Sequence, residues 1–464
     1  MKDDIKLITL QVGKKYEYLL PKINYVIDTF ESIYYLNDPI LISYGMDANE
    51  GVQIQPGNVE NYFSSQNEEP DYSMIKWNKT KIPILFTSIN MEEGSFIKYK
   101  ENCTLINCDL LMSTFYFLSS WQEYMSTKKD DFGRFPFKDS FIKELNIVKI
   151  PIVNYYFDIL INAIENCNSN NNISMKKKHG YGLKIGITHD IDNCQTGSYQ
   201  DSYRQFISGD WLSAIKKGVN RIYNEDIWFN FHQLLKIEND LDVLSSYYFN
   251  PNNNTINGHT NADYNFQSKK IQSVIHEIET HKHEIGLHGS IGTGFNQVQF
   301  QDEIRKFSTH VFGNRFHNLL FRVKESFPIL EKTGIDYDSS LGFAENIGFR
   351  NGFCFPYKPY NFEKDMAYSF YEFPFQVMDR TLIDKNYMGL PPEQAIKAIT
   401  RIMNEINKFS GYFIFIWHNN TITGFKYSKW KSVFTDIIEY GKELNAEFLP
   451  LALFNSRLKN VNNV

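Results

Sequence analysis

The stretch Lys184–Asn193, KIGITHDIDN, decides the fold class and locates the chemistry. Its first half consists of small and β-branched apolar residues, which is typical of a buried strand. The strand leads directly into His189, Asp190 and Asp192, where a Gly, Asn or Pro would be the usual ending. These side chains bind metals and transfer protons, so the stretch predicts functional groups at the end of a buried strand.

The sequence around this stretch repeats the same pattern of an apolar run followed by an amphipathic helix. Helical spacing of apolar residues appears near Ile271–Ile278, Ile399–Ile406 and Trp430–Ile438. About seven or eight such alternations predict a distorted (β/α) barrel of about seven strands; an open parallel sheet fits the same pattern, because periodicity does not show closure. The expected strands are Leu183–Thr188, Val243–Phe249, Glu284–His288, Phe316–Val323, Ile335–Ser340, Tyr371–Val377, Tyr412–Trp417 and Glu447–Phe454.

A polar segment, Asn166–Gly182 (NCNSNNNISMKKKHGYG), divides the 464 residues. It predicts a smaller N-terminal α/β accessory domain at 1–165, a linker at 166–182 and the barrel at 183–464. All 11 histidines lie at or after His179, so histidine chemistry belongs to the second part. In the first part we expect strands at Lys6–Val12, Ile40–Tyr44 and Ile82–Thr87, and helices at Asp109–Met125 and Asn154–Ile164.

Composition excludes some classes of function. A net charge of −6 and a pI near 6.0 give no basic face for nucleic acid. No run approaches the ~18 apolar residues of a membrane helix, and the first residues lack the pattern of a signal peptide, so we expect no membrane span and a cytoplasmic location. Five cysteines without a CxxC pair predict reduced thiols. The oligomeric state is not specified by the sequence.

Further expected strands also end in ionisable residues, at His288, at His418 and around Arg315 and His317. The carboxyl ends of parallel barrel strands meet at one rim, where Asp and His together suit a divalent metal. A single Asp after a strand is more often a helix cap, and a lone His is more often structural. Helix capping explains Asp190 and Asp192 less well as a pair. Two carboxylates two positions apart on an extended chain face the same way, and they repel each other unless a cation or a shared proton lies between them.

Five motifs then occur in an order that resembles the polysaccharide deacetylase (NodB homology) family of carbohydrate esterases. They are THDID, HEIGLHGS, GNRFHNLLFR, GIDYDSSLGF with GFRNG, and FIFIWHN, covering roughly residues 182–420. The segment DLLMSTFYFLSSWQEYMSTKKDDFGRFP also resembles one that precedes such domains in a bacterial subgroup. The resemblance implies removal of acetyl groups from amino sugars with a divalent metal, zinc first, with cobalt or another divalent ion as alternatives.

Carried over by position, the resemblance implies that Asp190 is the general base and Asp192 the metal carboxylate. It also implies that His288 is a metal ligand, that Arg315 orients the base and that His418 is the general acid.

Three departures from the family pattern matter. Ile191 separates the two acids, so the base and ligand roles could be exchanged. Gly292 stands where the family often has its second metal histidine, four residues after the first. Arg315 is followed by Phe316 and His317 in place of proline and an aromatic residue. We infer that His317 fills the missing ligand position; without it, two protein ligands remain.

The expected function is a metal-dependent hydrolase that removes N- (or O-) acetyl groups from an amino-sugar glycan or from a precursor of a bacterial surface polysaccharide. A glycoside hydrolase on a related barrel and a glycan-binding barrel without activity are the alternatives. His189 and Asp379 are candidates for supporting groups near the site, with structural capping an equal alternative for both.

Overall fold

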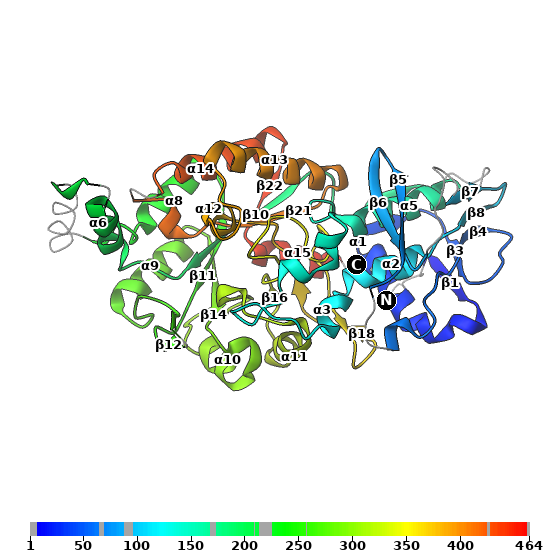
Figure 1. The fold of residues 1–464 in the computed structure, drawn as a ribbon, viewed down its shortest axis with the longest axis horizontal. Helices are drawn as coiled ribbons and strands as arrows, with labels where there is room; N and C mark the ends of the chain where they lie inside the picture. The colour runs from blue at the N-terminus through cyan, green and yellow to red at the C-terminus, as the bar shows by residue number, and fades with distance from the viewer. Residues whose placement is uncertain are drawn as a thin grey trace.

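A computed structural model describes residues 7–64, 69–87, 96–167, 173–207, 209–212, 225–256, 258–424 and 427–461. Two mainly parallel sheets lie side by side in it (Figure 1). One is built from strands between Ile8 and Ile106, and the other from strands between Lys184 and Phe448.

The N-terminal sheet has the strand order β1-β3-β4-β8-β7. Its first four strands are parallel, and β7 runs antiparallel to β8. One sheet face is apolar, since Ile8, Ile42, Val52 and Ile106 are fully buried. The strands are β1 (Ile8–Val12), β3 (Ile40–Tyr44), β4 (Gly51–Ile54), β7 (Ile97–Tyr99) and β8 (Cys103–Ile106), and the long helices are α1 (Leu20–Ile33), α2 (Leu110–Leu118) and α5 (Ile152–Glu165).

Asp109 connects β8 to α2 and caps that helix. Its Oδ1 accepts a hydrogen bond from the Met112 backbone N–H, and its Oδ2 accepts from the Gly57 N–H and the Tyr44 hydroxyl. Burial raises the pKa of Asp109 to about 6, although these three donors favour the charged form.

Smaller elements complete this part: β2 (Tyr34–Leu36), β5 (Tyr72–Trp77), β6 (Thr80–Leu85), α3 (Trp121–Met125), α4 (Phe141–Glu144) and β9 (Met175–Lys177).

The C-terminal strands follow one another around a ring in chain order: β10, β11, β14, β15, β16, β19, β20, β21 and back to β10. All these pairings are parallel, and hydrogen bonding is interrupted only between β19 and β20 among the described residues. The predicted distorted (β/α) barrel is therefore confirmed, with eight strands in the ring. They are β10 (Lys184–Ile191), β11 (Ser245–Phe249), β14 (Glu284–Gly289), β15 (Gly313–Phe316), β16 (Tyr337–Asp338), β19 (Tyr371–Glu372), β20 (Val377–Met378) and β21 (Tyr412–Ile416).

Helices surround this ring (Figure 1). In α9, the Ser268 side chain caps the first turn by accepting from the Ile271 N–H, and the apolar stripe that starts at Ile271 is buried. The helices are α6 (Gly197–Ile207), α8 (Phe231–Asp240), α9 (Lys269–Thr280), α10 (Gln297–Ile304), α11 (Val323–Thr333), α12 (Asp379–Ile383), α13 (Pro392–Phe409), α14 (Trp430–Glu443) and α15 (Leu451–Val461); short hairpins are formed by β12 (Thr255–Ile256) with β13 (His259–Thr260) and by β17 (Tyr360–Asn361) with β18 (Met366–Ala367).

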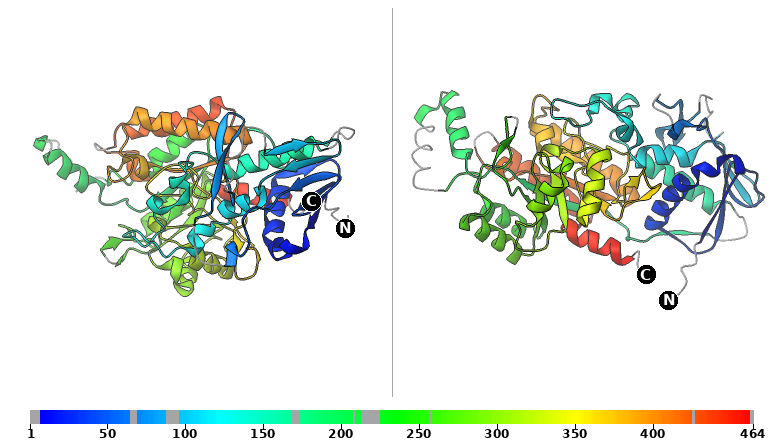
Figure 2. Two further views of the ribbon diagram at one scale, coloured as in Figure 1. Left: turned by 45° about the vertical axis from the view of Figure 1, so that its right-hand side comes forward. Right: turned by 90° about the horizontal axis from the view of Figure 1, so that it is seen from below.

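The last helix, α15, closes the amino end of the barrel. The Leu451 N–H donates to Ser246 Oγ, and a side chain at Gly186 would collide with Leu451. The red ribbon of this helix is clearest in the right-hand view of Figure 2. With the amino end filled, the carboxyl ends of the strands are the open rim of the barrel.

Several predicted elements are wrong at their ends. The strand expected at 316–323 is wrong, because the strand observed there is Gly313–Phe316; residues 317–319 form a short helical turn in which Asn318 and Leu319 have left-handed backbone conformations. The strand expected at 371–377 is two short strands separated by residues that include Pro374. The run at 447–454 gives only β22 (Glu447–Phe448) before α15 begins. The helix expected at 109–125 breaks into α2 and α3 at Ser120 (φ 57°).

The boundary predicted at 166–182 stays a prediction. Inside this segment, β9 pairs with β2 of the N-terminal part.

All five cysteines are free and buried, as expected for reduced thiols. None of the described helices has both the length and the apolar character that crossing a bilayer requires.

Candidate metal centre

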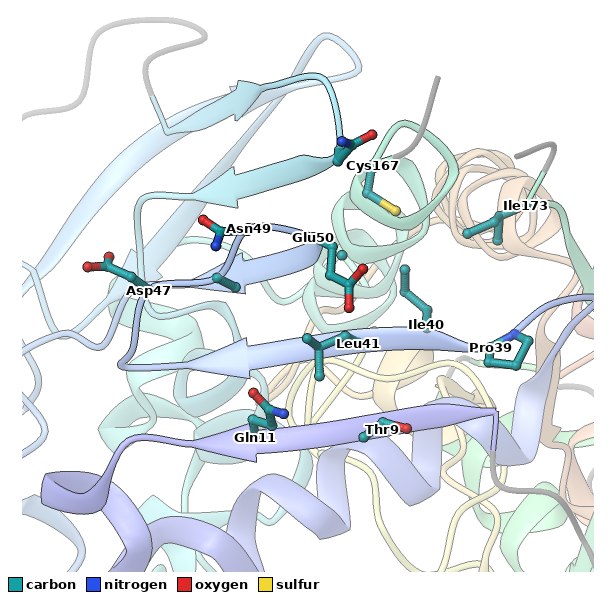
Figure 3. A pocket seen from close by; sticks show the side chains of 13 residues that line it. Thr9, Gln11, Pro39, Ile40, Leu41, Asp47, Asn49, Glu50, Cys167 and Ile173 are labelled. Atoms are coloured by element: carbon teal, nitrogen blue, oxygen red, sulfur yellow. The ribbon is translucent and has the colours of Figure 1, made fainter. Parts of the chain in front are cut away.

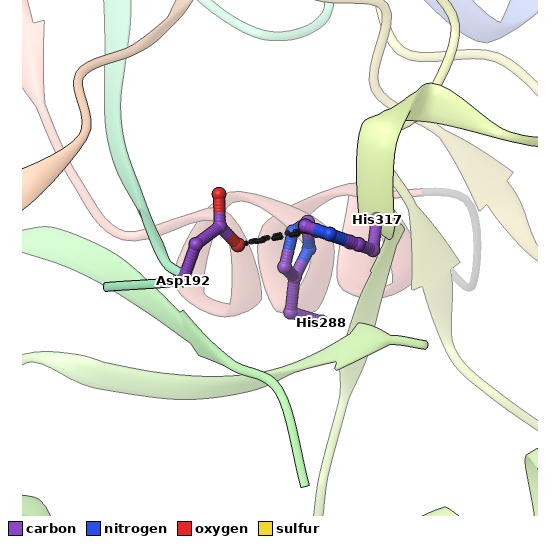
Figure 4. Close-up of side chains that lie close together, drawn as sticks. All are labelled: Asp192, His288 and His317. Atoms are coloured by element: carbon purple, nitrogen blue, oxygen red, sulfur yellow. Dashed lines mark hydrogen bonds and ion pairs between the residues drawn. The ribbon is translucent and has the colours of Figure 1, made fainter. Parts of the chain in front are cut away.

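Asp192, His288 and His317 meet at the carboxyl ends of β10, β14 and β15; β14 and β15 are adjacent, and β11 lies between β10 and β14. Asp192 Oδ1 lies 3.1 Å from His288 Nε2 and 3.2 Å from His317 Nδ1, and the two imidazole nitrogens are 3.0 Å apart. Figure 4 shows the three side chains pointing toward one another. Within the described ranges, no other three His, Cys, Asp or Glu residues bring ligand atoms this close.

Hydrogen bonds fix the tautomers of both histidines. His288 Nδ1 lies 2.9 Å from the Arg315 carbonyl oxygen, and His317 Nε2 lies 3.3 Å from the Thr260 carbonyl oxygen. A carbonyl only accepts, so each of these nitrogens carries a proton and donates it. In the neutral rings, the nitrogens facing Asp192 are therefore lone-pair acceptors, as metal-binding imidazoles require.

This arrangement fits a divalent ion. Three acceptor atoms about 3 Å apart, with no proton between neutral rings, repel one another unless a cation or an added proton lies among them. Asp192 Oδ1 is buried and has no hydrogen-bond partner. Tetrahedral ligands at zinc distances of about 2.1 Å are about 3.4 Å apart, close to the observed separations.

Charge within the cluster shifts two pKa values. Burial opposes the ionisation of Asp192, but His317 and His288 hold its pKa well below the usual range of an aspartate. Burial likewise opposes a charge on His288, but Asp190 and Asp192 raise its pKa above the ordinary value. Both shifts show that the carboxylates attract positive charge to this point; a bound ion would supply that charge in place of a proton on His288.

Asp190 lies on the same side of β10 as Asp192 but makes different contacts. Its Oδ1 accepts from Arg315 Nη1 at 3.0 Å. Arg315 is fully buried, and its other donors bind Thr188 Oγ1 (2.7 Å), the Ser339 carbonyl (2.7 Å) and Ser339 Oγ (2.8 Å). The guanidinium therefore has one fixed position, and it fixes Asp190 in turn.

His418 lies two positions after the end of β21, the strand that pairs with β10, and faces Asp192. Its Nε2 lies 3.6 Å from Asp192 Oδ2, and its Nδ1 donates to Asp379 Oδ1 at 2.7 Å. Asp379 Oδ2 accepts from the His418 backbone N–H and from the Thr421 hydroxyl. Burial alone would lower the pKa of His418, but the carboxylates of Asp379 and Asp192 raise it. Asp379 therefore contacts both the ring and the backbone of His418, and it also accepts from the Arg380 N–H at the start of α12.

His189 points away from the site. As the residue between Thr188 and Asp190, it occupies the other face of β10. Its Nδ1 donates to the Trp417 carbonyl at 2.6 Å, and its Nε2 lies 2.9 Å from Glu238 Oε1. Of its two interpretations, the structural one is supported, and a place beside the ion is excluded by the strand alternation.

The glycine at the family's second histidine position has a backbone reason. Gly292 has φ 98° and ψ −21°, a conformation that residues with a side chain rarely adopt. A histidine there would be strained, whereas His317 reaches the cluster from the adjacent strand end.

A cavity of about 370 Å³ contains this cluster. Phe132 and Arg134, from the N-terminal part, line it together with Arg380 and Tyr387. Sequence reasoning assigned no function to these four residues, because nothing in their local pattern indicates a contact with residues that are far away in the chain. The six predicted site residues, Asp190, Asp192, His288, Arg315, His317 and His418, are brought together, and all but the fully buried Arg315 line the cavity.

A second cavity, of about 1010 Å³, lies against the N-terminal sheet (Figure 3). Thr9, Gln11, Asp47, Asn49 and Glu50 are among its polar lining residues. Gln53 Nε2 donates to Asp47 Oδ1 at 3.2 Å. No histidine contributes to its lining, and its carboxylates do not converge on a shared point with other ligand atoms.

Comparison with known proteins gives one family match, to a family of unknown function (DUF7033), over residues 8–169. No curated protein matches the chain. Similar solved structures include a candidate polysaccharide deacetylase from Mycobacterium smegmatis, with 14% identity and a TM-score of 0.40 over 61% of this chain and 91% of that one.

The chitin deacetylase of Colletotrichum lindemuthianum is also similar, with 12% identity and a TM-score of 0.32 over 59% of this chain and 86% of that one. A CE4 family pseudoenzyme from Bacillus anthracis has 12% identity and a TM-score of 0.31, covering 59% of this chain and 65% of its own. All three TM-scores are below 0.5, so we argue the function from the residues of this chain.

Proposed function

We propose that the protein is a metal-dependent hydrolase that removes acetyl groups from the nitrogen, or from an oxygen, of an amino sugar in a glycan or glycan precursor. The observation that carries this proposal is the composition of one cavity. It combines three converging acceptor atoms, an arginine-bound carboxylate and a carboxylate-bound imidazole. Hydrolysis of an amide requires a Lewis acid, a base and an acid in the same place.

Asp192, His288 and His317 would hold the ion. When bound, a divalent metal, zinc in the first place, would polarise the acetyl carbonyl and lower the pKa of water from ~15.7 towards ~7. The two histidine ligands are almost fully buried, which strengthens these electrostatic effects.

Asp190 would act as the general base. Its hydrogen bond with Arg315 directs one carboxylate oxygen inward and keeps the group in place at the cavity wall. The proton of the attacking water would move to Asp190 as the carbon–oxygen bond forms. The contacts favour this assignment over the exchanged one, since Asp190 touches the arginine while Asp192 touches both imidazoles.

His418 would act as the general acid. Asp379 binds Nδ1, so Nε2 is the nitrogen that faces the cavity and carries the transferable proton when the ring is charged. The raised pKa of His418 keeps the ring protonated to a higher pH than an isolated histidine. Donation to the departing amine nitrogen would accompany cleavage of the carbon–nitrogen bond.

The two alternatives have less support. A glycoside hydrolase works with two carboxyl groups that flank the scissile bond, and it has no use for the imidazoles of His288 and His317 that share Asp192. A glycan-binding barrel without activity would have no use for the Asp379–His418 pair or for the Arg315–Asp190 pair, and both pairs are present.

Acetate release is the decisive measurement. Purified protein is stripped with a chelator, reloaded with zinc or cobalt, and incubated with N-acetylated hexosamine oligomers. We expect acetate only after reloading, and no cleavage of chromogenic glycosides. Glycoside cleavage without metal would contradict the proposal in favour of a glycoside hydrolase. Stoichiometric metal with no acetate from any N- or O-acetylated sugar tested would favour the binding protein.

A further inference from the structure

The turn Asp130–Arg134 belongs to the N-terminal part but reaches the rim of the barrel. Phe132 and Arg134 line the same cavity as His317 and Asn318. Arg134 Nη1 donates to the Asn318 carbonyl at 3.1 Å, across 184 positions of sequence. The acceptor belongs to the residue directly after a proposed metal ligand.

The backbone after His317 needs support. Asn318 has φ 56° and ψ 16°, and Leu319 has φ 53°. Two consecutive non-glycine residues in the left-handed region are strained and persist only where surrounding contacts hold them. Arg134 supplies such a contact at the first of the two peptide groups.

Arg134 is itself held rigidly. Its backbone N–H donates to Asp130 Oδ1 at 2.8 Å and its Nε donates to Asp130 Oδ2 at 2.7 Å. Its guanidinium carbon lies 4.6 Å from the centre of the Phe132 ring, and only 7% of the residue is exposed. A side chain fixed in this way places its remaining donors at defined points.

The same turn touches the second support of His317. The Phe132 ring lies 5.0 Å from the His259 ring in β13. The next residue, Thr260, accepts the Nε2–H of His317. The turn therefore contacts both the peptide that follows the ligand and the strand that orients its ring.

We propose that the Asp130–Arg134 turn is a positioning element for the metal ligand His317, with Arg134 acting through the Asn318 carbonyl. This inference rests on the proposed metal centre. It assigns to the N-terminal part a direct share in metal affinity, and it explains how a ligand from a strained strand end replaces a histidine at position 292.

The competing explanation is that Arg134 only joins the two parts. Arg350 offers a matched control, because it forms the same kind of contact away from the cavity. Its Nε and Nη2 donate to Glu123 at 2.7 and 2.8 Å, and its Nη1 donates to the Gly342 carbonyl at 2.8 Å. Arg350 is likewise buried and does not line the cavity.

The test compares zinc and cobalt affinity of the full chain, by calorimetric titration of the stripped protein, in wild type, Arg134→Ala and Arg350→Ala. Outer partners of metal ligands are typically worth ~10–100-fold in affinity, so we expect a loss of this size in Arg134→Ala and no change in Arg350→Ala. The cobalt absorption spectrum should change in Arg134→Ala alone, since a shifted His317 alters the ligand geometry.

Equal metal affinities in wild type and a folded Arg134→Ala would overturn the positioning proposal while leaving the proposed function intact. A wild type that takes up no metal would overturn the proposed function, and the positioning proposal with it. If Arg134→Ala does not fold, the milder pair Asp130→Asn and Glu123→Gln replaces the two variants. Only Asp130→Asn should then weaken metal binding, and equal affinities would again refute the proposal.

Discussion

In each of the two sheets an aspartate follows a buried strand. The two aspartates differ in the groups that surround them. Asp109 follows β8 and receives hydrogen bonds from two backbone N–H groups and a tyrosine hydroxyl. Asp192 follows β10 and faces two imidazole nitrogens, with Oδ1 lacking any hydrogen-bond partner. The first is a satisfied helix cap, whereas the second has the surroundings of a candidate cation site.

Volume alone would favour the N-terminal cavity as the reactive site. The hollow against the N-terminal sheet is the larger, at about 1010 Å³ against about 370 Å³ at the barrel rim. Of these two cavities, the smaller one is where the described His and Asp side chains converge. Convergence of ionisable side chains identifies a reactive site in this molecule, and volume does not.

The largest expected effect is on zinc affinity, and it should differ between substitutions of the two aspartates. Asp192→Asn removes a carboxylate that contacts both imidazoles, so zinc affinity should fall by more than ~100-fold and acetate release should be lost. Asp109→Asn, the matched change in the other sheet, should leave zinc affinity and turnover as they are. Equilibrium dialysis with metal analysis measures both, and full zinc occupancy in Asp192→Asn would contradict the assignment.

His418→Gln should affect turnover without affecting the ion. General acid catalysis typically contributes ~10²–10⁴-fold, and we expect kcat to fall by that amount while zinc stoichiometry stays the same. The glutamine keeps much of the size of the imidazole, so the cavity should keep its shape. An unchanged kcat would remove His418 from the mechanism.

Asp379→Asn should move the alkaline limb of the pH profile. The negative charge of Asp379 raises the pKa of His418, so its removal lowers that pKa. An acid works while protonated, and activity is lost as the pH rises through its pKa; in Asp379→Asn the loss should therefore begin at a lower pH. We expect a reduction of about 10-fold at pH values where the wild type is still active. The pH dependence of kcat measures this, with Asp109→Asn as the control whose limb should not move.

The smallest expected effect is on the free energy of unfolding, through the helix cap Asp109. The pKa of Asp109 is raised to about 6 by burial, so its contribution to stability is complete below the unfolded value of 3.8 and declines as the pH rises through 6. The wild type should lose on the order of 1–3 kcal/mol between pH 4 and 7 from this group, and Asp109→Asn, which keeps a capping side chain, should lose less. Urea unfolding midpoints of wild type and Asp109→Asn across this pH range measure the effect. If Asp109 were uncharged throughout, the two midpoints would change with pH in parallel, and the prediction would be wrong.

The barrel follows from local patterns, and the six candidate site residues follow from the same strand ends together with the motif resemblance; their roles stay predictions. A buried strand that ends in HDID, or an apolar run that ends in His288, carries its meaning within a few positions. Strand ends were predicted less well where backbone conformation decides them, as at Asn318 and at Pro374. The contribution of Arg134 was not predictable, because its acceptor lies 184 positions away and no local spacing records it.

The buried cysteines give the protein five built-in reporters of transient opening. Cys103, Cys108 and Cys167 lie in the N-terminal part, and Cys194 and Cys354 lie in the barrel. A buried thiol reacts with an alkylating reagent only when its surroundings open, so the rate at which each one is labelled reports the local free energy of opening. Mass spectrometry of the labelled peptides would read the two parts separately, and equal rates would mean that they unfold as a single cooperative unit.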